Sequence, residues 1–196
     1  VVVKALSRFD IHQNSFVIFG SLSLIQSDAT LAPLFQRLSM LPYQIGCLEK
    51  PGIYVYDVPS VGVDLVCAQP HEGNGSASLL SLEKAVSLCL DRSIDGIVTG
   101  PIAKASWNLA GSSFTGHTSF LSSQIGNQEV SMAFYSPTLK VILATIHVPL
   151  VDVASYMTQI TLDRVARHGF DYMASLGIKR PRIALAGLNP HASVGG

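Results

Sequence analysis

The sequence has few charged and few aromatic residues. Only 13% of its 196 residues are Asp, Glu, Lys or Arg, acidic and basic residues number 13 each, and aromatic residues make up 8%. Because binding to a nucleic-acid backbone depends on clustered Lys and Arg, this balance argues against a nucleic-acid partner. Hydrophobic residues make up 48% of the chain, which excludes intrinsic disorder and indicates a globular protein.

Cysteines and long hydrophobic runs are also scarce. The three cysteines, Cys47, Cys67 and Cys89, are widely spaced in apolar surroundings, which favours reduced thiols over a disulfide framework or a Cys-x-x-Cys site. The longest apolar stretch, 141–153, contains His, Pro and Asp and is shorter than the roughly 20 residues that span a bilayer. No signal-peptide pattern opens the sequence. We therefore predict a cytoplasmic protein without a membrane partner.

Apolar periodicity predicts alternating strands and helices. Strands are expected at 15–19, 53–58, 63–68, 94–98, 130–135, 141–146 and 182–186. Helices are expected at 22–40 with a break near 27–28, and at 78–90, 119–125, 151–157 and 162–176. This order predicts an α/β protein with a mainly parallel or mixed sheet and two lobes, at 1–111 and 112–196.

A glycine-rich segment, 69–78, half-matches the dinucleotide-binding fingerprint G-x-G-x-x-G. Gly73 and Gly75 fit, but Ser78 stands at the third glycine position, and no acidic residue stands at the right distance after a following strand. Since glycine-rich loops before helices are common, a plain loop is the favoured interpretation.

Polar residues follow the predicted strand 94–98. Thr99, Gly100 and Pro101 predict a sharp turn into a helix, because Pro suits the first helical position and the residues before it can cap the helix. The free amides of that turn, together with Lys104, then suit a small anion. Further on, the T-G-H-T sequence at 115–118 sets an imidazole beside a hydroxyl. Ordinary capping residues at two strand-to-helix connections explain the same pattern equally well.

Position along the chain divides the six histidines into two groups. His12, His71 and His168 lie in polar loops or near a helix end, and we expect them to be solvated. The second group follows apolar strands or their turns, at the edge where open α/β sheets bind ligands. Its members are His117, His147 and His191.

Two of these histidines stand in loops stiffened by proline. His147 precedes a Val-Pro pair and His191 ends an Asn-Pro-His sequence, which suits metal ligation, although a lone histidine at such a place is more often structural. Zinc and similar ions usually need at least three protein ligands. Asp152, Asp95 or a residue outside this chain would complete the set.

Four motifs occur in the order V-T-G-P-I-x-K, G-H-T, T-x-H-x-P-L and G-L-N-P-H-A. With them the chain resembles the 4-hydroxythreonine-4-phosphate dehydrogenase family of vitamin B6 biosynthesis over most of its length. The resemblance implies the two-lobed fold of isocitrate and isopropylmalate dehydrogenases, with a cleft between the lobes, and a homodimer whose active site uses both subunits. It also implies oxidation of 4-phosphooxy-L-threonine by NAD or NADP, then decarboxylation to 3-amino-2-oxopropyl phosphate in pyridoxal phosphate biosynthesis.

The resemblance also implies roles for individual residues. His117 and Thr118 would contact the phosphorylated hydroxy amino acid, and His147 and His191 would bind a divalent metal, Zn²⁺, Mg²⁺ or Co²⁺. The possible phosphate or cofactor contacts are Thr99, Gly100, Lys104 and Asn189. No catalytic residue is assigned.

The sequence departs from the family pattern in several places. Ala103 replaces an Asn, Ser119 stands where an acidic residue usually follows G-H-T, and Ser193-Val194 replace Gly-Glu. The family's third metal histidine belongs to a C-terminal segment beyond these 196 residues, so we expect the fragment alone to bind metal weakly and to be inactive. Three alternatives stay open: a related dehydrogenase of a phosphorylated four-carbon sugar acid, a phosphate acyltransferase on the same broad fold, and an inactive binding module.

Overall fold

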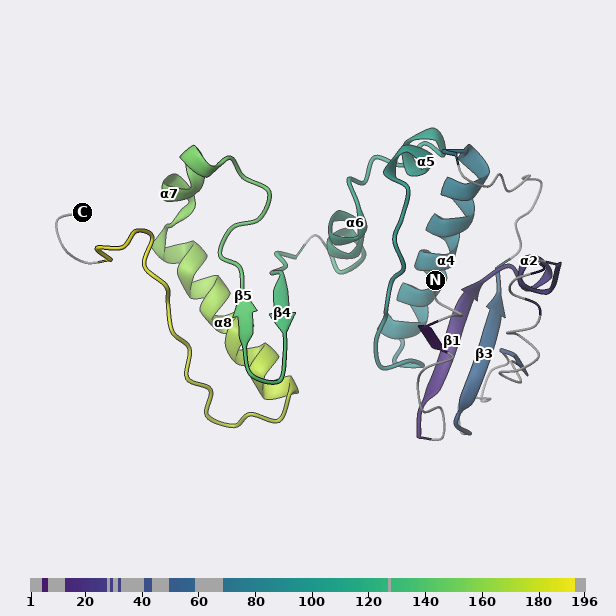
Figure 1. The fold of residues 1–196 in the computed structure, drawn as a ribbon, viewed down its shortest axis with the longest axis horizontal. Coiled ribbons are helices and arrows are strands. Elements are labelled where there is room, and N and C mark those ends of the chain that lie inside the picture. The colour runs from purple at the N-terminus through teal and green to yellow at the C-terminus, as the bar shows by residue number, and fades with distance from the viewer. Residues whose placement is uncertain are drawn as a thin grey trace. The chain divides into compact units, whose positions relative to one another are not determined.

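The computed structural model describes residues 5–6, 13–27, 29, 32, 41–43, 50–58, 69–126 and 128–192. The chain divides into two units, Val1–Gln128 and Glu129–Gly196. Each unit contains both helices and strands, which confirms the predicted α/β class (Figure 1). The strand predicted at 63–68 lies outside the described residues.

The first unit contains a three-stranded parallel sheet. Its strands are β1 (Ser15–Gly20), β2 (Leu41–Pro42) and β3 (Gly52–Asp57), in the order β1-β3-β2. The central strand β3 buries Ile53, Tyr54 and Val55 in succession, as expected of a parallel strand covered on both faces. Helix α2 (Leu22–Ser27) follows β1 directly and ends at the predicted break. The predictions for β1, for β3 and for the start of α2 are therefore confirmed.

Three helices build the second core of this unit. They are α4 (Glu72–Leu90), α5 (Lys104–Leu109) and α6 (His117–Gln124), and α4 also runs beside β1 (Figure 1). Apolar side chains from all three helices meet in one buried cluster, formed by Leu82, Val86, Trp107 and Phe120. Among the described residues, no helix is both long enough and apolar enough to cross a membrane.

The glycine-rich segment is helical, so the predicted loop at 69–78 is wrong beyond its first residues. Helix α4 begins at Glu72, where the side chain of His71 caps it by accepting a hydrogen bond from the Gly73 amide at 3.2 Å. Gly75 faces α5 so closely that a β-carbon there would lie 2.0 Å from the carbonyl oxygen of Ser106. The glycine therefore serves close helix packing, which its sequence context does not reveal.

Two predicted strands and one predicted helix start are also wrong. The sheets of the described residues contain only β1-β3-β2 and β4-β5, and neither 94–98 nor 182–186 joins them. Val98 is 98% exposed. A β-branched run becomes a strand only where another strand offers hydrogen bonds, and no described strand pairs with this segment. Helix α5 begins at Lys104 after Ala103, three residues beyond Pro101.

The second unit contains an antiparallel hairpin of β4 (Ala133–Tyr135) and β5 (Lys140–Ile142). Its turn closes with a hydrogen bond of 2.8 Å from the Ser136 amide to the Leu139 carbonyl. Both strands are shorter than predicted, although the turn at 136–137 is confirmed. The chain continues through a 3-10 turn (Leu150–Asp152) and α7 (Val153–Tyr156) into the long helix α8 (Gln159–Ser175).

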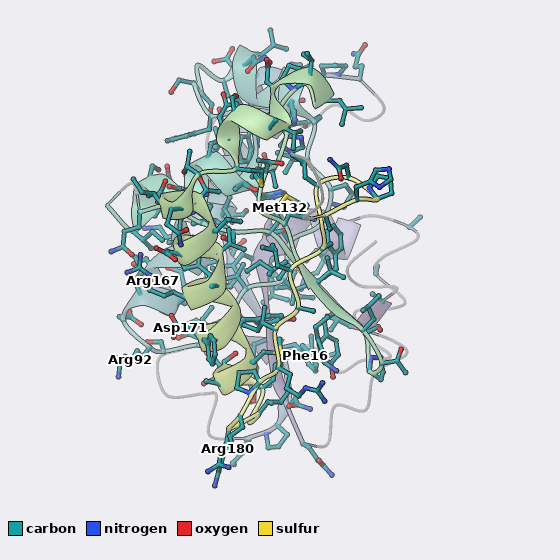
Figure 2. All side chains as sticks on the ribbon, turned by 90° about the vertical axis from the view of Figure 1, so that its left-hand side faces the viewer. Phe16, Arg92, Met132, Arg167, Asp171 and Arg180 are labelled. Carbon is teal, nitrogen blue, oxygen red and sulfur yellow. The ribbon has the colours of Figure 1, made fainter. Side chains whose placement is uncertain are left out.

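Helix α8 has one buried and one exposed face. Val165 and Gly169 are buried, whereas Arg167 and Asp171 lie on one side of the helix and are exposed (Figure 2). The Thr158 side chain caps the first turn by accepting from the Thr161 amide at 3.2 Å. The helix ends before residue 177, a glycine with φ of 79°. The helix predicted at 162–176 is therefore confirmed, with a start three residues earlier.

The segment just after the predicted lobe boundary packs with the first unit. Phe114 and Phe120 make edge-to-face contacts with each other at 5.2 Å between ring centroids, and Phe120 lies 6.2 Å from Trp107 in the same way. These contacts attach α6 to α5, which explains why the first unit extends to Gln128. The lobe division at 111/112 stays a prediction about the longer fold of the family.

Candidate active site

His117 and Thr118 form the start of α6 rather than a loop before it. The helix begins at His117, two residues earlier than predicted, and Gly116 is its N-terminal flanking residue. Gly116 has φ of 158°, which residues with a β-carbon rarely adopt. Because Gly116 has no side chain, it cannot accept a capping hydrogen bond from the amides of the first helical turn. These amides carry the positive end of the helix dipole, which favours an anion.

The imidazole of His117 lies against the core. Its ring is 5.8 Å from the ring of Trp107, centroid to centroid, and the two planes are inclined at 74°. Trp107 is fully buried, and its indole N–H donates a hydrogen bond of 2.8 Å to the hydroxyl of Ser78 on α4. Burial lowers the pKa of His117 below its ordinary value of 6.5. At neutral pH the imidazole is therefore uncharged, and one ring nitrogen can donate a hydrogen bond while the other accepts one.

Lys104 approaches the same turn. A β-carbon placed on Gly116 would lie 3.6 Å from Cε of Lys104, so the lysine stem passes beside the start of α6. The structure thus brings Lys104 together with the Gly116–His117 turn, although the predicted helix start that first associated it with an anion is wrong. Thr99 and Gly100 belong to the irregular segment before α5, where Thr99 is exposed and Gly100 is half-buried.

His147 has an unusual backbone conformation. It follows β5 by five residues, its side chain is exposed, and its φ is 55°. A residue with a β-carbon is uncommon in this left-handed region. Such conformations cost free energy, and they are found preferentially at functional sites. The strained backbone is a structural signal at one of the predicted metal ligands.

His191 lies in a tight turn that Asn189 holds. The side-chain oxygen of Asn189 accepts hydrogen bonds from the amides of His191 and Ala192, at 2.9 Å and 3.0 Å. A β-carbon on Gly187 would lie 2.5 Å from Cβ of Ala192, so the turn closes tightly on itself. Asn189 therefore orients the loop that carries His191. Among the described residues, no group of three or more His, Cys, Asp or Glu side chains is placed to hold a metal ion.

The two remaining described histidines are not simply solvated, contrary to the sequence prediction. His71 is half-buried and caps α4. His168 is half-buried in the second unit, where its Nδ1 lies 2.7 Å from the hydroxyl of Ser131. His12 lies outside the described residues.

A cleft of about 360 Å³ opens in the second unit, and its lining includes Ser131, the hydrogen-bond partner of His168. Its lining mixes aliphatic side chains with the hydroxyls of Ser131, Thr145 and Thr161, and it includes an ion pair between Arg164 and Glu129. Thr145, Ile146 and Val148 lie within the T-x-H-x-P-L motif, but the other lining residues belong to none of the four motifs, so the motifs did not predict this cleft.

Comparison with known proteins shows the class to which this α/β chain belongs. A family model described as "Pyridoxal phosphate biosynthetic protein PdxA" matches residues 12–196, so the chain is a member of that family. A 4-hydroxythreonine-4-phosphate dehydrogenase of Sulfurihydrogenibium sp. (strain YO3AOP1) is 32% identical over 100% of this chain and 60% of its own length. The enzyme of that name from Stutzerimonas stutzeri (strain A1501) is 41% identical over 86% of this chain and 55% of its own.

Solved structures agree with the sequence relatives. A putative 4-hydroxythreonine-4-phosphate dehydrogenase from Salmonella typhimurium superposes with a TM-score of 0.84 at 25% identity, covering 100% of this chain and 62% of that one. A 4-hydroxythreonine-4-phosphate dehydrogenase from Burkholderia phymatum gives a TM-score of 0.79 at 27% identity, covering 97% and 58%. The chain therefore spans between half and two thirds of the length of these relatives.

Proposed function

We propose that the whole protein oxidises 4-phosphooxy-L-threonine with NAD or NADP and decarboxylates the product to 3-amino-2-oxopropyl phosphate, in pyridoxal phosphate biosynthesis. The family match over residues 12–196 carries this proposal, and the relatives bear the corresponding enzyme name. The proposal includes the two-lobed fold of isocitrate and isopropylmalate dehydrogenases, a homodimer with a shared active site, and a cytoplasmic location.

The phosphate of the substrate would bind at the start of α6. Three kinds of donor gather there: the imidazole of His117, the hydroxyl of Thr118, and the first amides of the helix. The ammonium of Lys104, whose stem passes beside Gly116, adds a positive charge. An uncharged His117 contributes a hydrogen bond without needing to lose a proton, and the negative ligand would in turn raise its pKa.

A divalent metal fits the donor types of His147 and His191. Both side chains are exposed, and imidazole nitrogens suit Zn²⁺ and Co²⁺. When bound, the metal would lower the pKa of the substrate hydroxyl and stabilise the negative charge on its oxygen, while the nicotinamide accepts the hydride. The Asn189 side chain would keep the His191 backbone in place for this role. The strained backbone of His147 would fix the direction of the other ligand.

The reaction balances without a further reactant. The hydroxyl carbon loses a hydride to the nicotinamide and its oxygen loses a proton, which leaves a ketone in the β position to the carboxylate. The carbon–carbon bond to the carboxylate then breaks, carbon dioxide leaves, and a proton returns to the carbon that carries the amine. A phosphate held by His117 and Thr118 would anchor the substrate through both steps, so these residues position it and do not exchange the hydride.

The test is a turnover assay on the whole protein with 4-phosphooxy-L-threonine, NAD or NADP, and each metal in turn, followed by absorbance of the reduced nicotinamide. We expect turnover with this substrate, and His117→Ala should weaken substrate binding by roughly tenfold to a hundredfold, the range for a charge-assisted hydrogen bond. The melting temperature should barely change, because the imidazole is only half-buried.

Two matched substrates make the outcome specific. The same compound without its phosphate should react poorly, and equally poorly with the His117→Ala variant, because the lost contact is to the phosphate. Turnover only with a phosphorylated four-carbon sugar acid would replace the proposed substrate. Absence of nicotinamide reduction with either compound would contradict the dehydrogenase function.

A further inference from the structure

Ser119, in the first turn of α6, is the centre of the hydrogen bonds that shape the turn before His117. Its hydroxyl oxygen accepts from the amide of Thr115 at 3.0 Å and from the amide of Gly116 at 3.2 Å. It also accepts from the Thr115 hydroxyl at 3.2 Å and donates to the carbonyl oxygen of Gly116 at 3.0 Å. One side chain therefore engages both residues that lead into the helix.

This arrangement compensates for the glycine at the helix start. Gly116 contributes no side chain and has the widest backbone freedom of any residue, so the direction of the chain into α6 depends on other contacts. Ser119 stands three residues after Gly116, the position from which a polar side chain reaches back to the first amide in a capping box. Because its hydroxyl takes up the Gly116 amide, the amides of the next two residues are left to face a ligand.

We propose that Ser119 is a positioning residue for the phosphate site, an inference that rests on the proposed function. The hydroxyl of Ser119 holds the 115–116 turn so that the His117 imidazole, the Thr118 hydroxyl and the first amides of α6 point at one phosphate group. Ser119 itself need not touch the ligand, since its oxygen is engaged with the backbone. The lowered pKa of His117 agrees with a ring kept against Trp107 by this turn.

The experiment compares three variants of the whole protein with the unsubstituted one. Ser119→Ala removes the hydroxyl, and Ser119→Thr keeps it. Ser123→Ala is the matched control, because the hydroxyl of Ser123 in the same helix donates to the Phe120 carbonyl at 2.6 Å and accepts from the Gln124 side chain at 3.4 Å, away from the 115–116 turn. Binding of inorganic phosphate is measured by the NMR shifts of the His117 imidazole, and the melting temperature by circular dichroism.

We expect Ser119→Ala to weaken phosphate binding about two- to tenfold, the effect of losing a net hydrogen bond. The KM for 4-phosphooxy-L-threonine should rise by a similar factor while kcat changes less. The Ser119→Thr variant should bind phosphate as the unsubstituted protein does, and so should Ser123→Ala. In Ser119→Ala the pKa of His117 should move back toward 6.5. This pKa is measured on the folded protein, so a lower free energy of unfolding alone would not change it.

The outcomes separate this inference from the proposed function. Phosphate binding that is unchanged in Ser119→Ala, with His117 titrating as before, overturns the positioning role and leaves the function standing. A weakened affinity that Ser119→Thr fails to restore also overturns it, because the hydroxyl would then not be the responsible group. Failure of the unsubstituted protein to bind either phosphate or substrate overturns the proposed function and this inference with it.

Discussion

Replacing Gly75 with alanine tests the close packing of α4 on α5, which fixes the core beneath His117. A β-carbon at this position would lie 2.0 Å from the Ser106 oxygen, 2.5 Å from its carbonyl carbon and 2.9 Å from Cβ of Ala110. Ordinary contact begins at 3.4 Å, so the helices must separate by about 1.4 Å, the difference between 3.4 and 2.0 Å. The obstacle is backbone, which cannot rotate away as the end of a flexible side chain can.

The magnitude follows from two opposing effects. Overpacking a core costs about 1–3 kcal/mol, and a backbone clash of this size belongs at the upper end. Alanine is favoured over glycine inside a helix by about 1 kcal/mol, which offsets part of that cost. We therefore expect Gly75→Ala to lower the free energy of unfolding by about 2 kcal/mol, and the melting temperature by about 4–8 °C for a chain of this size.

The assay is urea unfolding followed by the fluorescence of Trp107, the single tryptophan of the sequence, and by circular dichroism. Gly169→Ala in α8 is the matched control, because the added β-carbon would meet side chains and no backbone: the terminal methyl of Ile183 at 3.2 Å, and a methyl of Ile142 at an ordinary contact distance of 3.9 Å. That side chain can turn aside, so the control should be within about 0.5 kcal/mol of the unsubstituted protein or more stable. Equal stability of both variants would refute the packing argument.

Three further predictions concern the site and its support. Burial lowers the pKa of His117 in the folded protein, so the unfolded chain binds more protons. The resulting stability is complete above pH 6.5 and is lost as the pH falls through the folded-state pKa. His117→Gln should therefore flatten the dependence of the urea midpoint on pH between the folded-state pKa and pH 6.5. Ser78→Ala leaves the buried indole N–H of Trp107 without its partner and should cost about 1–3 kcal/mol in urea unfolding, whereas an unchanged midpoint would deny this bond a role. Asn189→Ala releases the turn that carries His191 and should weaken metal binding about 10–100-fold in a titration of the whole protein, and unchanged affinity would show that the turn does not support the ligand.

Local sequence patterns predicted the elements whose stabilising groups are close in the sequence. The end of helix α8 was predicted from the glycine at 177, whereas its start, which Thr158 caps, lies three residues before the predicted one. The hairpin turn at 136–139 likewise closes through its own backbone and the Ser136 side chain. The four motifs indicated the PdxA family without any structural information, and the family match confirms that identification.

Distant contacts decided what the patterns predicted wrongly. The residues at 94–98 have the composition of a strand, but in the part of the chain that the structure describes no neighbouring strand pairs with them. Gly73 and Gly75 suggested a loop, yet helix α4 extends through both. Gly75 is needed within the helix because the backbone of Ser106 on α5 occupies the space where a β-carbon would lie. Propensity alone cannot report a neighbour that lies about 30 residues away, which is why packing overrides it.

The same division holds within the candidate site. The sequence by itself determined which residue types are present: an imidazole and a hydroxyl after a glycine at 116, and two further histidines in stiff loops. Only the tertiary structure decided that His117 begins a helix, lies against Trp107 and has a lowered pKa, and that Ser119 holds the turn before it. Residue identity fixes which chemistry is available, whereas burial and hydrogen-bond direction depend on groups that the fold brings together from α4, α5 and α6.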